Sequence, residues 1–277
     1  MSIRRIPQGN RTHRAARWLA SAAVAAVLAL PMAGCKTTGD DTTGSIGAPA
    51  TPRNDAEWRK SLDVWGARYR EDPNNPEASM RYAQALRATE QRAQAVAVLE
   101  QASMRNPNDM AVLGAYGRAL AEAGDFGQAL DVLGRAHTPD NPDWRILNAQ
   151  GAVLDQMGRH AEAQKIYSNA LKIVPDEPSV LSNLGLSYAL MKNLKLAEVT
   201  LRRAVAQPNA APKARQNLAL VIGLQGRFAE AETIARADLP PDEASNNVAY
   251  LRQMLAQQNE WKKPGRKPYM PPPDAGG

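Results

Sequence analysis

The residue best suited to covalent chemistry is Cys35, the only cysteine among the 277 residues. It follows Met32, Ala33 and Gly34, and the two small residues suit the binding pocket of a peptidase. A lone cysteine has no partner for an intramolecular disulfide. The thiol is therefore expected either to be modified, or to remain free or pair with another chain.

Residues 1–34 have the pattern of an export signal. They contain five arginines and no acidic residue, and end in the apolar run WLASAAVAAVLALP. This run is too short to span a bilayer comfortably, since a spanning helix needs about 20 residues. Pro31 and Gly34 interrupt it, which argues against a transmembrane anchor that is kept. We predict a signal peptide over residues 1–34.

Residues 32–35 resemble the lipobox of bacterial lipoprotein signals, although Met32 stands where leucine is commoner. The resemblance implies that Cys35 receives a diacylglycerol, becomes the first residue of the mature chain and carries three acyl chains in a Gram-negative cell. Two or more chains hold a protein stably on a membrane. Lys36 replaces the aspartate that often retains lipoproteins in the inner membrane. The implied location is the periplasmic face of the outer membrane.

The charge of the chain is concentrated at its ends. The formal net charge of +6 comes largely from the arginines of the signal peptide and from the basic, proline-rich residues 261–277, which we predict to be disordered. The body between them is nearly neutral, so no nucleic-acid partner is expected. Residues 35–53 are small, polar and rich in Gly, Thr and Pro, which predicts a flexible tether behind Cys35.

From Pro76 onward the chain repeats itself with a period of 34 residues, and two series of small residues keep this step: Ala83, Gly117, Gly151, Gly185 and Ala219, then Ala95, Ala129, Ala163, Ala197 and Ala231. Large apolar residues follow at spacings of three and four, which predicts paired helices with a buried stripe. The small residues would let the two helices approach closely, and Gly124, Gly158 and Gly226 fall at the turns between them.

This pattern resembles the tetratricopeptide repeat (TPR), most closely at Leu181, Leu184, Gly185, Tyr188 and Ala197. The resemblance implies an all-α fold: a right-handed superhelical solenoid of helix-turn-helix repeats with helical caps. We expect five repeats over residues 76–245. Residues 54–75 match half a repeat and predict an N-terminal cap helix, and residues 246–260 predict a C-terminal cap helix.

Convergent reactive groups are missing from the repeats. No metal-ligand spacing, nucleotide-binding glycine loop or nucleophile motif is present, and His160 falls in an inter-helix turn where a solvated side chain is expected. We therefore expect a protein that is not an enzyme, with no cofactor, no metal and no small-molecule substrate. An enzyme or a sugar-binding protein is the alternative from another class.

A TPR stack typically holds a protein segment on its concave face, which its first helices build. The polar candidates on this face are Arg81, Gln84, Arg87, Arg118, Asn148, Asn183 and Asn217, and the apolar candidates are Leu186, Leu190, Leu220 and Leu224. The arginines could equally form a solvated face. The leucines could instead pack under the C-terminal helix or neighbouring copies. Lys213 and Asn217 have the spacing of a carboxylate clamp, but no repeat follows to complete one.

The lipobox, the repeats and the closing stretch NLALVIGLQGRFAEAETIARADLPPDEASNNVAYLRQML together resemble the TPR lipoproteins of the Tad (tight adherence) system, the TadD-like family, which serves the assembly of Flp pili. This implies a pilotin-like assembly factor that binds the secretin, or other pilus assembly components, and stays on the membrane through its lipid anchor. The alternative scaffold is a general envelope lipoprotein that recruits cell-wall enzymes or outer-membrane assembly factors.

Overall fold

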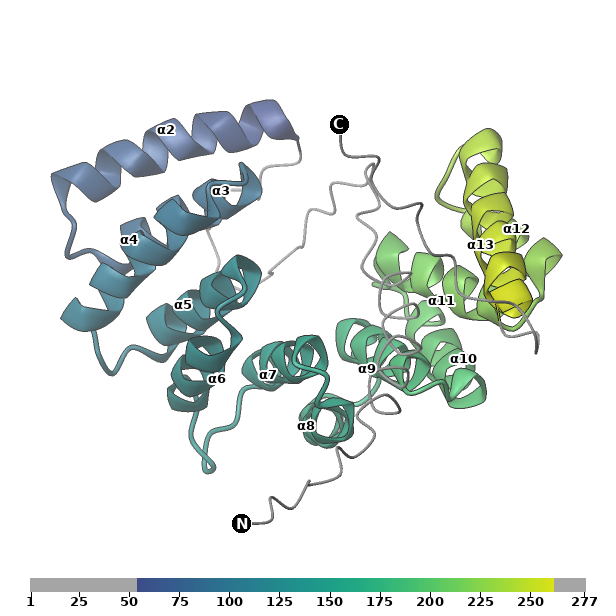
Figure 1. Cartoon of the computed structure of the whole chain (residues 1–277). Helices are drawn as coiled ribbons and strands as arrows, with labels where there is room; N and C mark the ends of the chain where they lie inside the picture. The colour runs from purple at the N-terminus through teal and green to yellow at the C-terminus, as the bar shows by residue number, and fades with distance from the viewer. Residues whose placement is uncertain (1–53, 262–277) are drawn as a thin grey trace, which may run out of the picture.

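The computed structural model describes residues 54–261, and this part of the chain is all-helical (Figure 1). The signal peptide, Cys35, the tether and the tail from residue 262 lie outside the described residues. The described helices are α2 (Asp55–Glu71), α3 (Pro76–Ala88), α4 (Arg92–Arg105), α5 (Met110–Ala123), α6 (Phe126–Arg135), α7 (Trp144–Gln156), α8 (His160–Ile173), α9 (Pro178–Leu190), α10 (Leu194–Val205), α11 (Pro212–Leu224), α12 (Phe228–Ala235) and α13 (Pro241–Trp261).

The helices from α3 to α12 form five helix-turn-helix pairs, as the 34-residue period predicts. Figure 1 shows the pairs following one another along an arc, with the first helix of each pair toward its inner side and the second toward its outer side. The helix α2 precedes the pairs and α13 follows them. The all-α superhelical fold expected from the sequence is confirmed.

The first helices begin at caps that recur in phase. Asn75 and Asp109 each accept a hydrogen bond from the backbone N–H groups of the first turn, at 3.0 Å to Ala78 and 2.9 Å to Ala111. Asp143 and Glu177 do the same for α7 and α9. Such side chains satisfy backbone donors that have no partner within the helix. The sequence therefore sets where the first helix starts in the first four repeats, whereas Ala211 before α11 provides no side-chain cap.

The turn inside each pair has a left-handed residue at one repeated position. Gly124, Gly158 and Gly226 have φ of 91°, 75° and 83°, which glycine adopts without steric cost. Glu90 and Lys192 take the same conformation in the other two copies, with φ of 63° and 64°. The geometry of the repeat thus imposes this conformation even on residues that have a Cβ.

The small residues of the first helices allow close helix packing, as expected. A Cβ added at Gly151 would overlap the ring of Tyr167, and one at Gly185 would lie 2.6 Å from Cγ of Leu201. Both partners are fully buried. The glycine in one helix therefore makes room for the large residue of the next.

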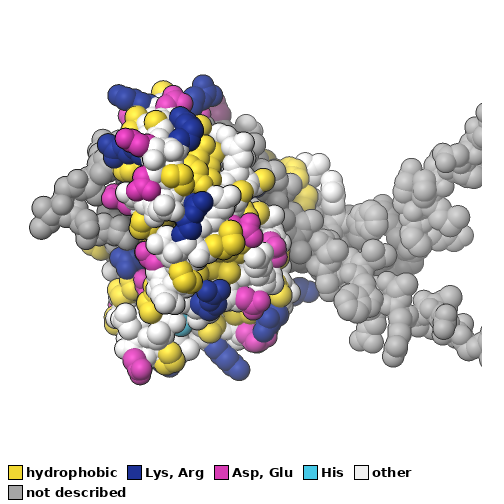
Figure 2. All heavy atoms as spheres, turned by 90° about the vertical axis from the view of Figure 1, so that its left-hand side faces the viewer, with side chains coloured by type: hydrophobic (Ala, Val, Ile, Leu, Met, Phe, Trp, Pro, Cys, Tyr) yellow, Lys and Arg dark blue, Asp and Glu magenta, His cyan; other side chains and the backbone are white. Residues whose placement is uncertain are grey.

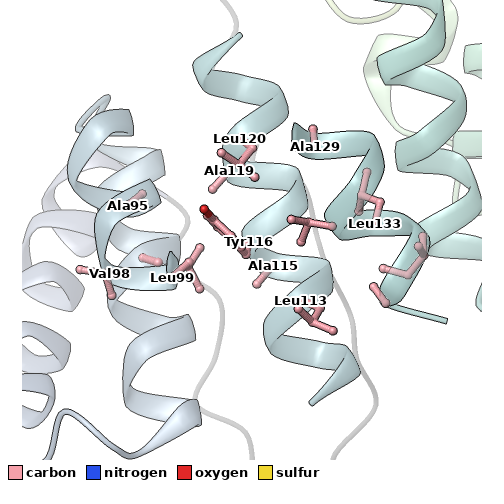
Figure 3. Close-up of a cluster of buried hydrophobic side chains, with 14 of the residues drawn as sticks. Ala95, Val98, Leu99, Leu113, Ala115, Tyr116, Ala119, Leu120, Ala129 and Leu133 are labelled. Carbon is pink, nitrogen blue, oxygen red and sulfur yellow. The ribbon is translucent and has the colours of Figure 1, made fainter. Parts of the chain in front are cut away.

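The core is continuous because each first helix packs on two neighbours. In Figure 3, α5 lies between α4 and α6, with Leu99 of α4 pointing toward Tyr116 and with Leu133 of α6 on the other side. The helix α7 also packs on both sides. Ile146 belongs to the same buried cluster as Leu99 and Leu133, while Leu147 belongs to the next cluster along the stack.

At the N-terminal end, Trp65 of α2 occupies the position that Leu99 has one repeat later. No described helix precedes α2 to cover this side chain. The guanidinium carbon of Arg68 lies 4.5 Å from the centroid of the Trp65 ring instead. A cation over an indole face is a favourable contact, and it gives this end of the stack a charged cover.

The C-terminal cap helix is longer than the sequence indicated. The helix α13 begins at Pro241, inside the expected fifth repeat, and includes Trp261, the first residue of the predicted tail. Asp242 and Glu243 lie in its first turn, where acidic side chains interact favourably with the helix dipole. Ala244 is fully buried against Ala219 and Ala235. Proline at the first position and this packing start the helix earlier than residue 246.

Candidate functional site

The candidate residues all lie on the first helices of the pairs, which line the inner side of the arc in Figure 1. The helix α3 carries Arg81, Gln84 and Arg87; α5 carries Arg118; α7 carries Asn148; α9 carries Asn183, Leu186 and Leu190; and α11 carries Asn217, Leu220 and Leu224. All are partly exposed except Asn217, which is buried. The candidate side chains of the inner surface are therefore mostly accessible in part to solvent.

Two arginines of the first two repeats contact other parts of the protein surface. Arg87 forms a bidentate ion pair with Glu122, with Nε donating to Oε2 at 2.7 Å, and so joins α3 to α5. Arg118 lies back over its own helix, with Nη1 3.5 Å from the point where a Cβ of Gly114 would be. Part of the cationic character expected of this surface is therefore neutralised within the protein.

The asparagines of the later repeats connect successive first helices. Asn183 donates from Nδ2 to Oδ1 of Asn148 at 2.9 Å, which joins α9 to α7. Asn217 donates to Oγ of Ser182 at 2.9 Å, which joins α11 to α9. Both pairs are 35 residues apart, one residue more than the repeat. These side chains have a structural partner already, and only Asn217 is withdrawn from solvent.

The four candidate leucines are the apolar part of the inner surface. Leu186, Leu190, Leu220 and Leu224 are partly exposed, and none belongs to a buried core cluster of the described residues. The C-terminal helix α13 packs on α11, placing Leu251 against Gly223, where an added Cβ would lie 2.5 Å from Cδ2 of Leu251. Partly exposed leucines in adjacent helices provide apolar area that a partner segment could bury.

The sequence did not reveal a polar cluster around Asp155, whose side chain is 10% exposed. Its carboxylate accepts hydrogen bonds from Ser187 at 2.7 Å and Tyr167 at 3.0 Å, and Nδ1 of His160 lies 2.8 Å from it. The expectation of a solvated His160 is therefore wrong, because this contact draws the ring against α7. One feature of the sequence does point to this cluster: Asp155 stands where the neighbouring copies have alanine.

The cluster has the residue types of a hydrolase but not the arrangement. Ser187 is fully buried and donates to the carboxylate, whereas a catalytic serine donates to the histidine and faces the substrate. Burial and the nearby Asp155 carboxylate raise the pKa of Tyr167 well above its usual range, which keeps its hydroxyl a donor. The cluster thus ties α7, α8 and α9 together.

Within residues 54–261, no group of three or more His, Cys, Asp or Glu could hold a metal ion. None of the helices in this range combines the length and the apolar character that crossing a membrane requires.

Charges elsewhere on the described surface are mostly interleaved. On the face at the left of Figure 1, basic and acidic side chains alternate among apolar ones (Figure 2). Glu198 of α10 accepts hydrogen bonds from Arg202 on the same helix and from Gln225 and Arg227 in the turn between α11 and α12. Partial burial opposes ionisation of Glu198, but these donors outweigh it and lower its pKa to about 2. This network stabilises the fourth and fifth repeats against each other.

Comparison with protein families identifies the repeats. Two models described as tetratricopeptide repeat match the chain, one at residues 67–119 and 86–151 and the other at residues 145–177. The comparison with curated proteins gives no match.

Solved structures with a similar fold come from unrelated settings. PilW, described as a widely conserved type IV pilus biogenesis factor, has 17% sequence identity and a TM-score of 0.61 over 70% of this chain and 91% of that chain. The APC/C hetero-tetramer Cut9–Hcn1 has 14% identity and a TM-score of 0.60, covering 74% of this chain and 40% of that chain. The human IFIT1 dimer with PPP-AAAA has 17% identity and a TM-score of 0.56, covering 75% and 51%. Residues 67–177 therefore carry tetratricopeptide repeats, and the described part of the chain has the fold of a TPR superhelix.

Proposed function

We propose that this protein is a lipid-anchored scaffold that acts as a pilotin-like assembly factor for the secretin of a Tad/Flp pilus system. The proposal rests on one observation above others: a lipobox-like sequence ending at Cys35 precedes a TPR superhelix on the same chain. A TPR superhelix is a protein-interaction scaffold, and an acylated cysteine would hold it on the periplasmic face of the outer membrane.

The fold comparison supports the pilus assignment. PilW, a type IV pilus biogenesis factor, has the same type of superhelix over most of its length. At 17% identity this likeness concerns the fold, so the link to a Tad system depends on the sequence resemblance of the last repeat and the helix that follows it.

The inner surface offers the secretin segment an apolar strip beside a polar one. Leu186 and Leu220 are partly exposed and lie outside the core. Arg87 and Asn217, in contrast, already bond to other side chains of the same protein. Burying apolar area contributes about 25 cal/mol per Å², so the leucines supply most of the affinity in this scheme. The polar side chains then set the position of the segment.

A pull-down of the secretin from solubilised membranes tests the surface. Changing Leu186 and Leu220 together to serine should reduce secretin capture at least tenfold while the protein stays folded, since both side chains lie outside the core. Met104→Ser is the matched control, because Met104 is an exposed apolar residue of an outer helix. Undiminished capture by the double variant would remove the inner surface from the proposal.

The anchor is tested separately by labelling cells with palmitate. The wild-type chain should incorporate the label, and Cys35→Ala should abolish incorporation and release the protein from the outer-membrane fraction. Continued incorporation by Cys35→Ala would show that the anchor is elsewhere.

A further inference from the structure

The outer helix of the fourth repeat, α10, differs from the outer helices of the other four. Leu196 stands where the others have Gln94, Gln128, Glu162 and Glu230, and Val199 stands where they have Ala97, Asp131, Lys165 and Thr233. Because the five copies share one backbone, they act as an internal control for what each position requires. Neither position requires a large apolar side chain for folding.

Both side chains of α10 face solvent. Leu196 is 39% exposed and Val199 is 57% exposed, while Ala197 and Leu201 on the opposite side of the helix are fully buried. Met191, in the turn before the helix, is 51% exposed. The exposed apolar residues therefore do not serve the core, which α10 fills with its other face.

Lysines accompany these apolar residues. Lys195 stands where the other copies have only alanine or glycine, and Lys192 occupies the left-handed turn position that is glycine in three copies. Both are exposed, and no ion pair with a carboxylate is found for either within residues 54–261. We define the α10 outer patch as Met191, Lys192, Lys195, Leu196 and Val199.

The patch continues onto the neighbouring outer helix. Gln164 of α8 donates from Nε2 to Sδ of Met191 at 3.3 Å, which brings the two surfaces together. Along α8, Lys165 and Lys172 line the same shallow, open hollow as Gln164. The outer sides of the third and fourth repeats thus combine lysines with the exposed apolar residues of α10.

We propose that the α10 outer patch rests on an anionic phospholipid surface. Apolar side chains flanked by lysines form the pattern of helices that lie at a membrane interface, and the lysines are attracted to anionic lipid headgroups. The patch has five residues, whereas a stable protein–protein interface typically involves about 20–30 residues on each side. Its position on the outer side leaves the inner surface open for a partner.

A weak contact of this kind suffices only for a protein that is already held at the membrane, so this inference rests on the lipid anchor of the proposed function. The tether predicted over residues 35–53 would reach roughly 20–25 Å as a flexible chain, which keeps the superhelix beside the bilayer. Tethering converts the contact into an intramolecular event with a high effective concentration.

The test uses the mature lipidated protein reconstituted into vesicles, with an environment-sensitive dye attached at Val199→Cys. In vesicles of equal parts phosphatidylglycerol and phosphatidylcholine, the dye emission should shift to the blue. The shift should be absent in pure phosphatidylcholine, and high salt should reduce it because screening weakens exposed charge contacts. The same dye at Met104→Cys, on the outer helix α4, is the matched control and should not shift.

A second variant separates the patch from general effects. Lys195→Ala with Leu196→Glu gives α10 the Ala-Glu pair that the chain already has at 161–162 and 229–230, so it should fold normally and lose the shift. Co-flotation of the protein with the vesicles reports the anchor independently. A floating protein whose Val199 dye stays unshifted with phosphatidylglycerol would overturn the patch but not the anchor. An equal shift in pure phosphatidylcholine would overturn the anionic requirement.

Discussion

The N-terminal and C-terminal parts of the inner surface use their polar residues differently. In the first two repeats, Arg87 and Glu122 pair near the surface, with the arginine side chain 20% exposed. In the last two, Asn217 is only 7% exposed and bonds to Ser182. The difference shows that successive first helices are connected by a partly exposed charged pair at one end and by a buried neutral pair at the other. The leucines are the groups left over for a partner.

The largest expected effect of this difference is on stability. Asn217→Ala leaves the buried hydroxyl of Ser182 without its donor and should lower the free energy of unfolding by about 1–3 kcal/mol. Arg81→Ala, in the other part of the surface, should change it by less than about 0.5 kcal/mol. Urea denaturation followed by circular dichroism measures both. Equal losses would mean that the two parts of the surface are alike.

Acid should weaken the C-terminal part through Glu198. Its pKa is lowered to about 2 in the folded protein from an ordinary value of 4.5. The group therefore contributes stability that is fully present above pH 4.5 and is lost as the pH falls toward 2. The change is measured by thermal unfolding across this range.

Glu198→Gln should flatten the acid decline in unfolding temperature. Arg227→Gln, which removes one donor to Glu198, should flatten it partly. A decline of unchanged slope in both variants would show that other carboxylates cause it.

Two double-mutant cycles should give the smallest effects and the sharpest contrast. Replacing Arg87 and Glu122 singly and together should give a coupling energy of up to about 1 kcal/mol that decreases with salt, because the pair is partly exposed. The cycle for Asn148 and Asn183 should give about 0.5–1.5 kcal/mol that salt does not change. A salt-dependent asparagine coupling would contradict this.

The period of the sequence predicted the fold because it encodes packing directly. Gly151 and Tyr167 are placed by their type and spacing, and the structure brings them into contact. The turn at Lys192 could be located only by phase, since its residue type does not favour a left-handed conformation. The conformational preference of lysine and the 34-residue period disagree at this position, and the backbone adopts the conformation that the period predicts.

The candidate site was harder to predict because the period says which residues face inward but not which of them bond to each other. Asn183 and Asn148 are 35 residues apart, and the hydrogen bond between them depends on how far successive repeats rotate. Asp155 depends on contacts at separations of 5, 12 and 32 residues, which belong to no single helix pattern.

The stacking of Arg68 on Trp65 bears on self-association. A solenoid has two unlike ends, and an uncovered apolar end could accept the opposite end of a second molecule and start an open-ended polymer. The guanidinium places a permanent positive charge over the indole at 4.5 Å, and such a charge would have to lose its water before another helix could dock there. This contact therefore disfavours end-to-end association of two superhelices at this end.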